Sequence, residues 1–205
     1  MRKALFFLFV LLTPALGWAD FVEVEDLRFE FQLPTKFVEQ SDLTGSTSTA
    51  LLDEIGAADR DDFLIYADPT ADVNEPCLLL FGKRGRHVAT GMGEDDFALF
   101  TLFLSLALVA EDENNPFGVP AVMDKAESLY DVVITLIDQR AFSFSVVIDE
   151  EVARYGAMVS YYHSGSCLFN VIQVALVDEL AGYNEFIGRA AVNLQNLGIS
   201  QIAPE

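Results

Sequence analysis

The sequence has little of the chemistry on which metal sites depend. Its 205 residues include two cysteines and two histidines, His87 and His163. These make at most one poor zinc site, because the spacing from His163 to Cys167 has no second pair that would complete tetrahedral coordination. Acidic runs at 59–62 and 112–115 lack the glycine and the final glutamate of a calcium loop. We therefore expect no metal and no cofactor.

Motifs that signal catalysis are also missing from the sequence. It contains no G-x-S-x-G motif, no phosphate-binding loop and no dinucleotide-binding fingerprint. The serine and glycine residues after His163 are typical of a turn, where adjacency in the sequence does not place a base on a hydroxyl. Paired carboxylates are left open by the 32 acidic residues. We therefore assign no catalytic residue and keep a carboxylate-dependent hydrolase as the alternative.

Basic residues are scarce. The chain has 12 Lys and Arg against 32 Asp and Glu, a net charge of −20 at pH 7. A field of this sign repels nucleic acid and anionic lipid, so we expect neither as a partner. It suits a basic protein partner, although adaptation to salt or plain solubility explains the same excess.

No apolar run in the sequence reaches the roughly 20 residues that cross a membrane. The first such run, at 4–12, follows a basic start at Arg2 and Lys3 and precedes small residues that end at Ala19. This arrangement is typical of a signal peptide and predicts one at 1–19. It is too short to be a membrane anchor.

Cleavage after Ala19 would leave one periplasmic or secreted domain at 20–205. All 32 acidic residues and ten basic residues lie in this part, so its net charge is −22. No cysteine directly follows the apolar run of the leader, so a lipid anchor is not expected. A chain of this length buries about 70% of its unfolded surface, which is enough for one core.

The second apolar run, at 97–110, lies between groups of carboxylates. As a helix its fourteen residues cover about 21 Å, against roughly 30 Å for a bilayer core, so we expect no membrane span. Asp95 and Asp96 favour a helix start there. Apolar residues occupy most of its circumference, so either the fold buries it on several sides or another chain covers part of it. The residues for such an interface are Phe97, Phe100, Phe103 and Leu104.

An even number of cysteines in an oxidising compartment predicts a single disulfide between Cys77 and Cys167. Closing a loop of about 90 residues would stabilise the fold by about 4 to 5 kcal/mol on the chain-entropy account. Two buried free thiols are the alternative.

Periodicity of apolar residues predicts an α+β fold. It favours a single domain with a twisted antiparallel sheet of about five to seven strands packed against helices. A long amphipathic helix is expected at 178–198, with Asp178 as N-cap and Gly198 as its stop. The segment 127–138 fits helix or strand, and 49–58 a short helix. Strands are predicted at 27–33, 61–69, 77–81, 85–90, 141–149, 153–165 and 167–176, the last two joined by a turn at 163–166.

A basic cluster interrupts this acidic sequence at GKRGRH, which we place at the tip of a β-hairpin. Its members are Lys83, Arg84, Arg86 and His87. Arginine side chains in such a group could bind a carboxylate, a phosphate or an acidic partner. The cluster also fits a charged turn that pairs with nearby acids and protects a strand edge.

The strand LRFEFQLPTKF and the closing hairpin with its amphipathic helix resemble the PsbP-like group, which includes bacterial periplasmic DcrB-type proteins. The resemblance spans 26–199 and implies a twisted antiparallel sheet with helices packed against it. It also implies a non-enzymatic accessory or adaptor role. The chain departs from the DcrB type in its missing lipoprotein cysteine and its long acidic insertions.

Together these observations predict a non-enzymatic periplasmic or secreted protein that binds another protein. An accessory, adaptor or toxin-neutralising role fits, because an acidic protein is steered toward a basic one. A homodimer is a further option. The alternatives are a carboxylate-dependent hydrolase and a binder of a small apolar ligand between sheet and helix.

Overall fold

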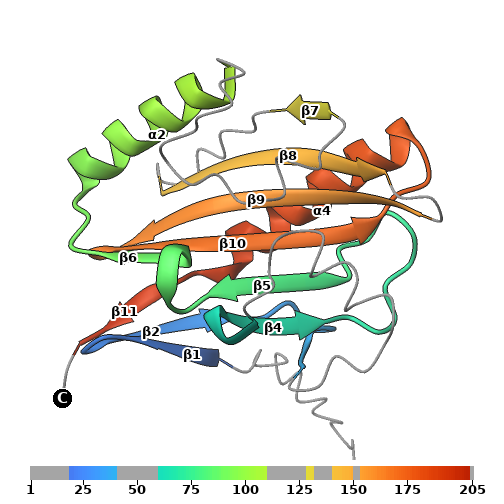
Figure 1. Ribbon diagram of the computed structural model, residues 1–205. Helices are drawn as coiled ribbons and strands as arrows, with labels where there is room; N and C mark the ends of the chain where they lie inside the picture. The colour runs from blue at the N-terminus through green and yellow to red at the C-terminus, as the bar shows by residue number, and fades with distance from the viewer. Residues whose placement is uncertain (1–18, 41–59, 110–127, 132–139, 150–152, 204–205) are drawn as a thin grey trace, which may run out of the picture.

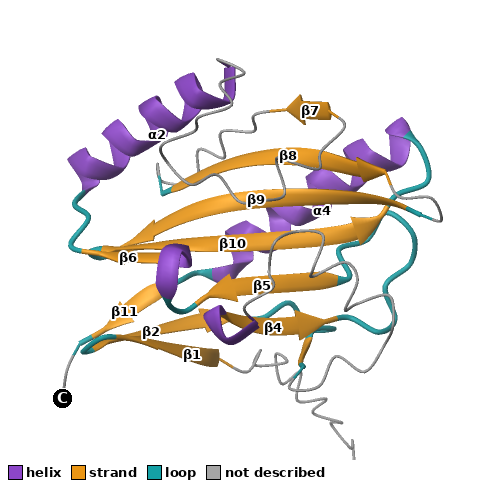
Figure 2. Ribbon diagram, in the orientation of Figure 1, coloured by secondary structure: helices purple, strands orange, loops and turns teal. Residues whose placement is uncertain are grey.

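The computed structural model describes residues 19–40, 60–109, 128–131, 140–149 and 153–203 (Figure 1). They form an α+β domain in which strands outweigh helices. A large antiparallel sheet is the centre of the fold, with the helix α2 (Glu94–Val109) on one face and the helix α4 (Leu180–Leu197) on the other. Figure 2 shows α4 passing behind the strands of this sheet.

Among the described residues, the large sheet has eight strands, in the order β3-β4-β5-β10-β9-β8-β7, with β6 also paired to β10. Nearly every residue of β9 and β10 is buried, because both faces of the sheet are covered at these central strands. The strand bounds are β3 Val38–Glu39, β4 Phe63–Ala67, β5 Leu78–Gly82, β6 Val88–Thr90, β7 Ser128–Asp131, β8 Ala141–Asp149, β9 Arg154–Ser164 and β10 Cys167–Leu176.

A second sheet of three strands packs against the face that carries α4. It consists of β1 (Ala19–Val24), β2 (Leu27–Gln32) and β11 (Ser200–Ile202), in the order β1-β2-β11. Its inward aromatic residues meet those of the large sheet: the Phe29 and Phe169 ring centroids lie 4.9 Å apart, and the Phe31 and Phe81 rings stack at 4.6 Å. These contacts join the two sheets into one core.

The predicted amphipathic helix is present as α4, and its apolar stripe is buried as expected. Gly198 ends it in the left-handed conformation with a φ of 54°, whereas the N-cap is Glu179 rather than Asp178. Gln173 of β10 anchors the helix by donating a hydrogen bond of 2.8 Å to the Ala190 carbonyl. The stripe residues that are fully buried are Tyr183, Phe186, Ala190, Leu194 and Leu197.

The predicted hairpin at GKRGRH is wrong. β5 and β6 lie on the same side of β10 and run in the same direction, because Phe81 is opposite Val171 and Val88 is opposite Phe169. Seven residues separate Phe81 from Val88, but their partners in β10, Val171 and Phe169, are only two residues apart. The basic cluster therefore lies in the connection between two strands that follow one another along β10, and this connection contains the short 3-10 helix Gly85–His87.

Other strand predictions are confirmed, including the β9–β10 hairpin in which Cys167 pairs with Ser164. The expected number of five to seven strands was too low, because very short edge strands and β1 have no clear periodicity. Of the ambiguous segment, 128–131 is strand, and the rest lies outside the described residues. The same is true of 1–18 and of the short helix predicted at 49–58.

Candidate functional site

The helix α2 presents an apolar stripe to solvent. Leu99, Leu102 and Leu106 are 53, 54 and 57% exposed, and Phe103 is 47% exposed. Their spacing of three and four residues places them on one side of the helix. These four residues are called the α2 stripe below.

The predicted interface residues divide between the core and this surface. Phe97 and Leu104 are buried, and the Phe100 ring packs on the Tyr161 ring at 5.1 Å, so these three residues face the sheet. Phe103 alone of the predicted set belongs to the α2 stripe. The predicted burial of the helix on several sides is also wrong for the leucines of this stripe. Phe97 stacks on His163 with ring centroids 5.2 Å apart, and this contact fixes which side of the helix faces the sheet.

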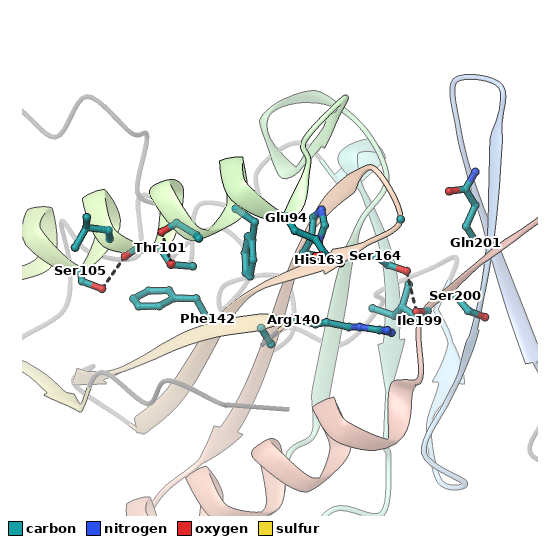
Figure 3. Close-up of a pocket in the computed structure, with 15 residues that line it drawn as sticks. Glu94, Thr101, Ser105, Arg140, Phe142, His163, Ser164, Ile199, Ser200 and Gln201 are labelled. Carbon is teal, nitrogen blue, oxygen red and sulfur yellow. Dashed lines mark hydrogen bonds between the residues drawn. The ribbon is translucent and has the colours of Figure 1, made fainter. Parts of the chain in front are cut away.

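A pocket of about 790 Å³ opens beside α2 (Figure 3). Four segments that are distant in the sequence form its walls: the first three turns of α2, the start of β8, the β9–β10 turn and β11. Its lining residues are Glu94, Phe97, Ala98, Thr101, Leu102, Ser105, Arg140, Ala141, Phe142, His163, Ser164, Gly165, Ile199, Ser200 and Gln201.

Several hydroxyl groups of this pocket are already bonded within the protein. Three of them donate to backbone carbonyl oxygens at 2.7 to 2.9 Å. They join Thr101 to Ala98, Ser105 to Thr101, and Ser164 to Ile199. Their hydrogens are therefore committed to the fold rather than directed at a ligand.

The imidazole of His163 is held in a similar way. Its Nε2 lies 2.8 Å from the carbonyl oxygen of Met92, and a carbonyl oxygen only accepts, so Nε2 carries a proton and donates it. The ring is 5% exposed and stacks on Phe97. His163 thus ties the loop before α2 to the end of β9.

Arg140 is the cationic side chain of this pocket, and Glu94 is its acidic side chain. Arg140 is exposed, and no hydrogen bond or ion pair of its guanidinium is found among the described residues. Sequence reasoning passed over Arg140. A signal was available, since it is a single basic residue directly before the strongly apolar strand β8.

The basic cluster does not form one convergent site. Arg84 lies at 3.1 Å from both Asp61 and Asp62, so two carboxylates already neutralise it. This contact matches the interpretation as a charged turn. The side chains of Lys83 and Arg86 are half-buried and exposed, respectively.

His87, the fourth member of the cluster, is a core residue. It is 5% exposed, and its ring centroid lies 4.2 Å from that of Phe63. Burial, followed by the nearby Arg86 charge, lowers the pKa of His87 to about 4. Its Nδ1 is buried with no hydrogen-bond partner among the described residues. At neutral pH this imidazole is uncharged and does not serve as an anion-binding group.

The predicted disulfide is not formed, and both cysteines are free. Cys77 donates its backbone N–H to the Val174 carbonyl at 2.8 Å, whereas Cys167 begins β10, seven residues away. Seven residues of strand span about 23 Å, and a disulfide requires Cα atoms within about 7 Å. Burial raises the pKa of both thiols. The alternative of two buried free thiols is confirmed for Cys167, whereas Cys77 is half-buried.

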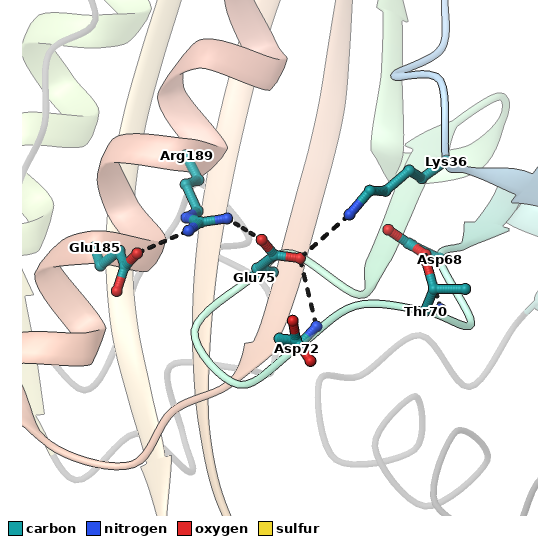
Figure 4. A network of polar contacts seen from close by, with 7 residues as sticks. All are labelled: Lys36, Asp68, Thr70, Asp72, Glu75, Glu185 and Arg189. Carbon is teal, nitrogen blue, oxygen red and sulfur yellow. Dashed lines mark hydrogen bonds and ion pairs between the residues drawn. The ribbon is translucent and has the colours of Figure 1, made fainter.

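A polar network crosses a second pocket, of about 570 Å³, between α4 and the loops at 34–37 and 68–76 (Figure 4). Glu75 is at its centre and pairs with Arg189 and with Lys36, the latter at 3.5 Å. The pKa of Glu75 is lowered by a backbone hydrogen bond from Asp72 and by these two cations. Arg189 also pairs with Glu185 at 2.8 Å. The network fastens α4 to the loop before β5.

No group of three potential metal ligands is found among the described residues. Within the same ranges, neither helix has the length and hydropathy that a membrane crossing requires.

Comparisons with known proteins leave the family open. No protein-family model matches the chain, and no curated protein matches it. A crystal structure of a protein from Bacteroides thetaiotaomicron VPI-5482 aligns over 86% of this chain with 12% identity and a TM-score of 0.38. The chain spans 45% of that protein's length. A similarity at this level supports neither a shared fold nor a shared function.

Proposed function

We propose that this is a non-enzymatic periplasmic or secreted protein that binds another protein through the α2 stripe. The observation that carries the proposal is the exposure of Leu99, Leu102 and Leu106 on one side of the helix. Scattered exposed leucines are common on protein surfaces, but a contiguous apolar stripe is typical of an interaction site.

The exposed apolar area of the α2 stripe can contribute to binding, but it is too small to hold a complex together by itself. Full burial of a leucine side chain is worth roughly 1.5 to 3 kcal/mol. Each stripe leucine is a little over half exposed, so covering one contributes about 1 kcal/mol. Three leucines then supply about 3 kcal/mol, and a stable complex needs contacts on the neighbouring surface as well.

Charge around the stripe indicates a basic partner. The first turn of α2 carries Glu94, Asp95 and Asp96, and the helix has no basic residue. The whole chain has a net charge of −20. A partner segment with apolar residues and a Lys or Arg opposite the first turn of α2 complements both features, and the field speeds its approach.

A second copy of the chain complements the stripe less well, because it brings the same negative charge to the contact. An accessory or adaptor role agrees with the resemblance to the PsbP-like group, and a toxin-neutralising role agrees with the charge. The α2 stripe itself is compatible with both roles.

Site-specific photo-crosslinking in the source cell tests the proposal. A photoreactive amino acid replaces Leu99 in the stripe. The matched control replaces Val192 on α4, which is 52% exposed and outside the stripe. We expect a crosslinked basic protein from position 99 and none from position 192.

A peptide measurement gives an answer that does not depend on an unknown partner. An amphipathic helical peptide of Leu and Lys should bind the purified protein, and the same peptide with Glu in place of Lys should not. The double variant Leu99→Ser with Leu106→Ser should lose the binding, whereas Val192→Ser should keep it. Equal binding by both variants, or a crosslink only between two copies of the chain, would overturn the proposal.

A further inference from the structure

We propose that the 790 Å³ pocket beside α2 binds a small monocarboxylic acid with an apolar tail, and that Arg140 holds the carboxylate. This site lies beside the α2 stripe and does not depend on the protein-binding function. Only Leu102 belongs to both.

The position of Arg140 is the first step. Figure 3 shows its side chain extending from the start of β8 toward Ile199 and Ser200 of the opposite wall. The guanidinium thus lies in the pocket rather than pointing away from it. Arginine offers a planar set of N–H donors that matches the two oxygens of a carboxylate.

The polar chemistry around Arg140 narrows the ligand further. The hydroxyls of Thr101, Ser105 and Ser164 donate within the protein, and so does Nε2 of His163. Besides Arg140, a sugar or another ligand rich in hydroxyls would find mainly the side-chain amide of Gln201 as a donor, because Ser200 bonds to Glu30. An anion needs only the guanidinium, which has no hydrogen bond or ion pair among the residues that the structure describes.

The rest of the wall combines apolar side chains with the polar side chains of Ser200 and Gln201. Phe97 and Phe142 line one side, Leu102 lies on the helix, and Ile199 closes the far end. Phe97, Phe142 and Ile199 are at most 5% exposed, so Leu102, which is 54% exposed, offers a ligand more apolar surface than these three. A volume of about 790 Å³ falls in the range of sites for drug-sized molecules. It exceeds what a bare inorganic anion fills, and an apolar tail on the ligand would contact Phe97, Leu102 and Phe142.

The charge of the pocket favours a single negative charge on the ligand. Among the described residues that line it, Arg140 is the one cation and Glu94 the one carboxylate. A phosphate dianion would meet the same single cation with twice the repulsion from Glu94 and from the acidic protein. A monocarboxylate is the better match.

Titration calorimetry with the full mature chain tests the site. The probe is decanoate at concentrations at which it is monomeric, and the comparison compounds are decanol, decyl phosphate and acetate. We expect decanoate to bind most tightly. Arg140→Gln should weaken it by about 10- to 100-fold, the usual loss for a charged hydrogen bond, and Arg140→Lys should weaken it less. Decanol should bind wild type more weakly than decanoate and should be indifferent to Arg140→Gln.

A second variant tests the need for the open pocket separately from the need for the Arg140 charge. Ala98→Trp would fill the pocket from an exposed helical position and should abolish binding while the thermal melt stays unchanged. Decanoate binding that survives both variants, or no binding at all, would refute the site. Tighter binding of decyl phosphate, or of a leucine-rich peptide with a free carboxyl terminus, would refute the ligand class. The Leu99→Ser and Leu106→Ser double variant should bind decanoate normally, so the two proposals fail separately.

Discussion

Loss of stability in mild acid should be traceable to His87. This imidazole is 5% exposed, stacks on Phe63 and is neutral at pH 7, with its pKa lowered to about 4 by burial and by Arg86. Asp62 acts in the opposite sense but is the smaller influence. In the unfolded chain a histidine has a pKa of about 6.5.

The sign of the effect follows from these two pKa values. Between about pH 4 and 6.5 the unfolded state binds a proton that the native state does not, so protonation favours unfolding. The contribution of neutral His87 to the free energy of unfolding is therefore complete above about pH 6.5 and is lost as the pH falls toward 4. One pKa unit corresponds to about 1.4 kcal/mol, so about 2 kcal/mol should disappear between pH 7 and pH 4.5.

Urea denaturation of wild type and of His87→Phe at several pH values from 4.5 to 7.5 measures this term. Phenylalanine keeps a ring against Phe63 but does not titrate. The many carboxylates titrate alike in both proteins, so the difference between their unfolding free energies isolates His87. We expect wild type to lose about 2 kcal/mol relative to the variant at pH 4.5. Curves that run parallel across the whole range would refute the reasoning.

Two further predictions concern stability at neutral pH. Gly82→Ala should destabilise the protein by about 1 to 3 kcal/mol, because the added Cβ would overlap the His87 carbonyl and lie 2.7 Å from its Cβ. Gly188→Ala is the control: it has open space on α4 and should stabilise by about 0.5 to 1 kcal/mol, so equal effects in urea melts would contradict the packing. Tyr66→Phe should cost about 1 kcal/mol by removing the 2.6 Å hydrogen bond to Asp20, and an unchanged thermal melt would show that this bond contributes nothing.

Local patterns in the sequence were sufficient for much of the fold. Alternation of apolar residues located β2, β8 and the β9–β10 hairpin, and spacing of three and four residues located α4 with its stop at Gly198. Each of these elements is determined by residues that are close together in the sequence, so the periodicity of apolar residues is enough to predict it. The start of α2 followed, to within one residue, from the carboxylates Asp95 and Asp96.

Partners that are distant in the chain could not be predicted. The expected hairpin at the basic cluster failed because both of its strands pair with β10, about 90 residues later. The expected disulfide failed for a related reason, since Cys77 and Cys167 approach opposite ends of that same strand. Strand register is set by the packing of whole faces, which no short segment records.

The candidate sites show the same division. The sequence alone determined that the apolar run of α2 is too short to span a membrane and that the chain is strongly acidic. Both properties are obtained by counting residues and need no knowledge of the fold. Only the tertiary structure decided which side of α2 meets solvent, because an almost uniformly apolar helix has no preferred face until Phe97 stacks on His163. Only the tertiary structure, likewise, brought Arg140 within reach of α2 and β11, since a pocket exists only where separate segments converge.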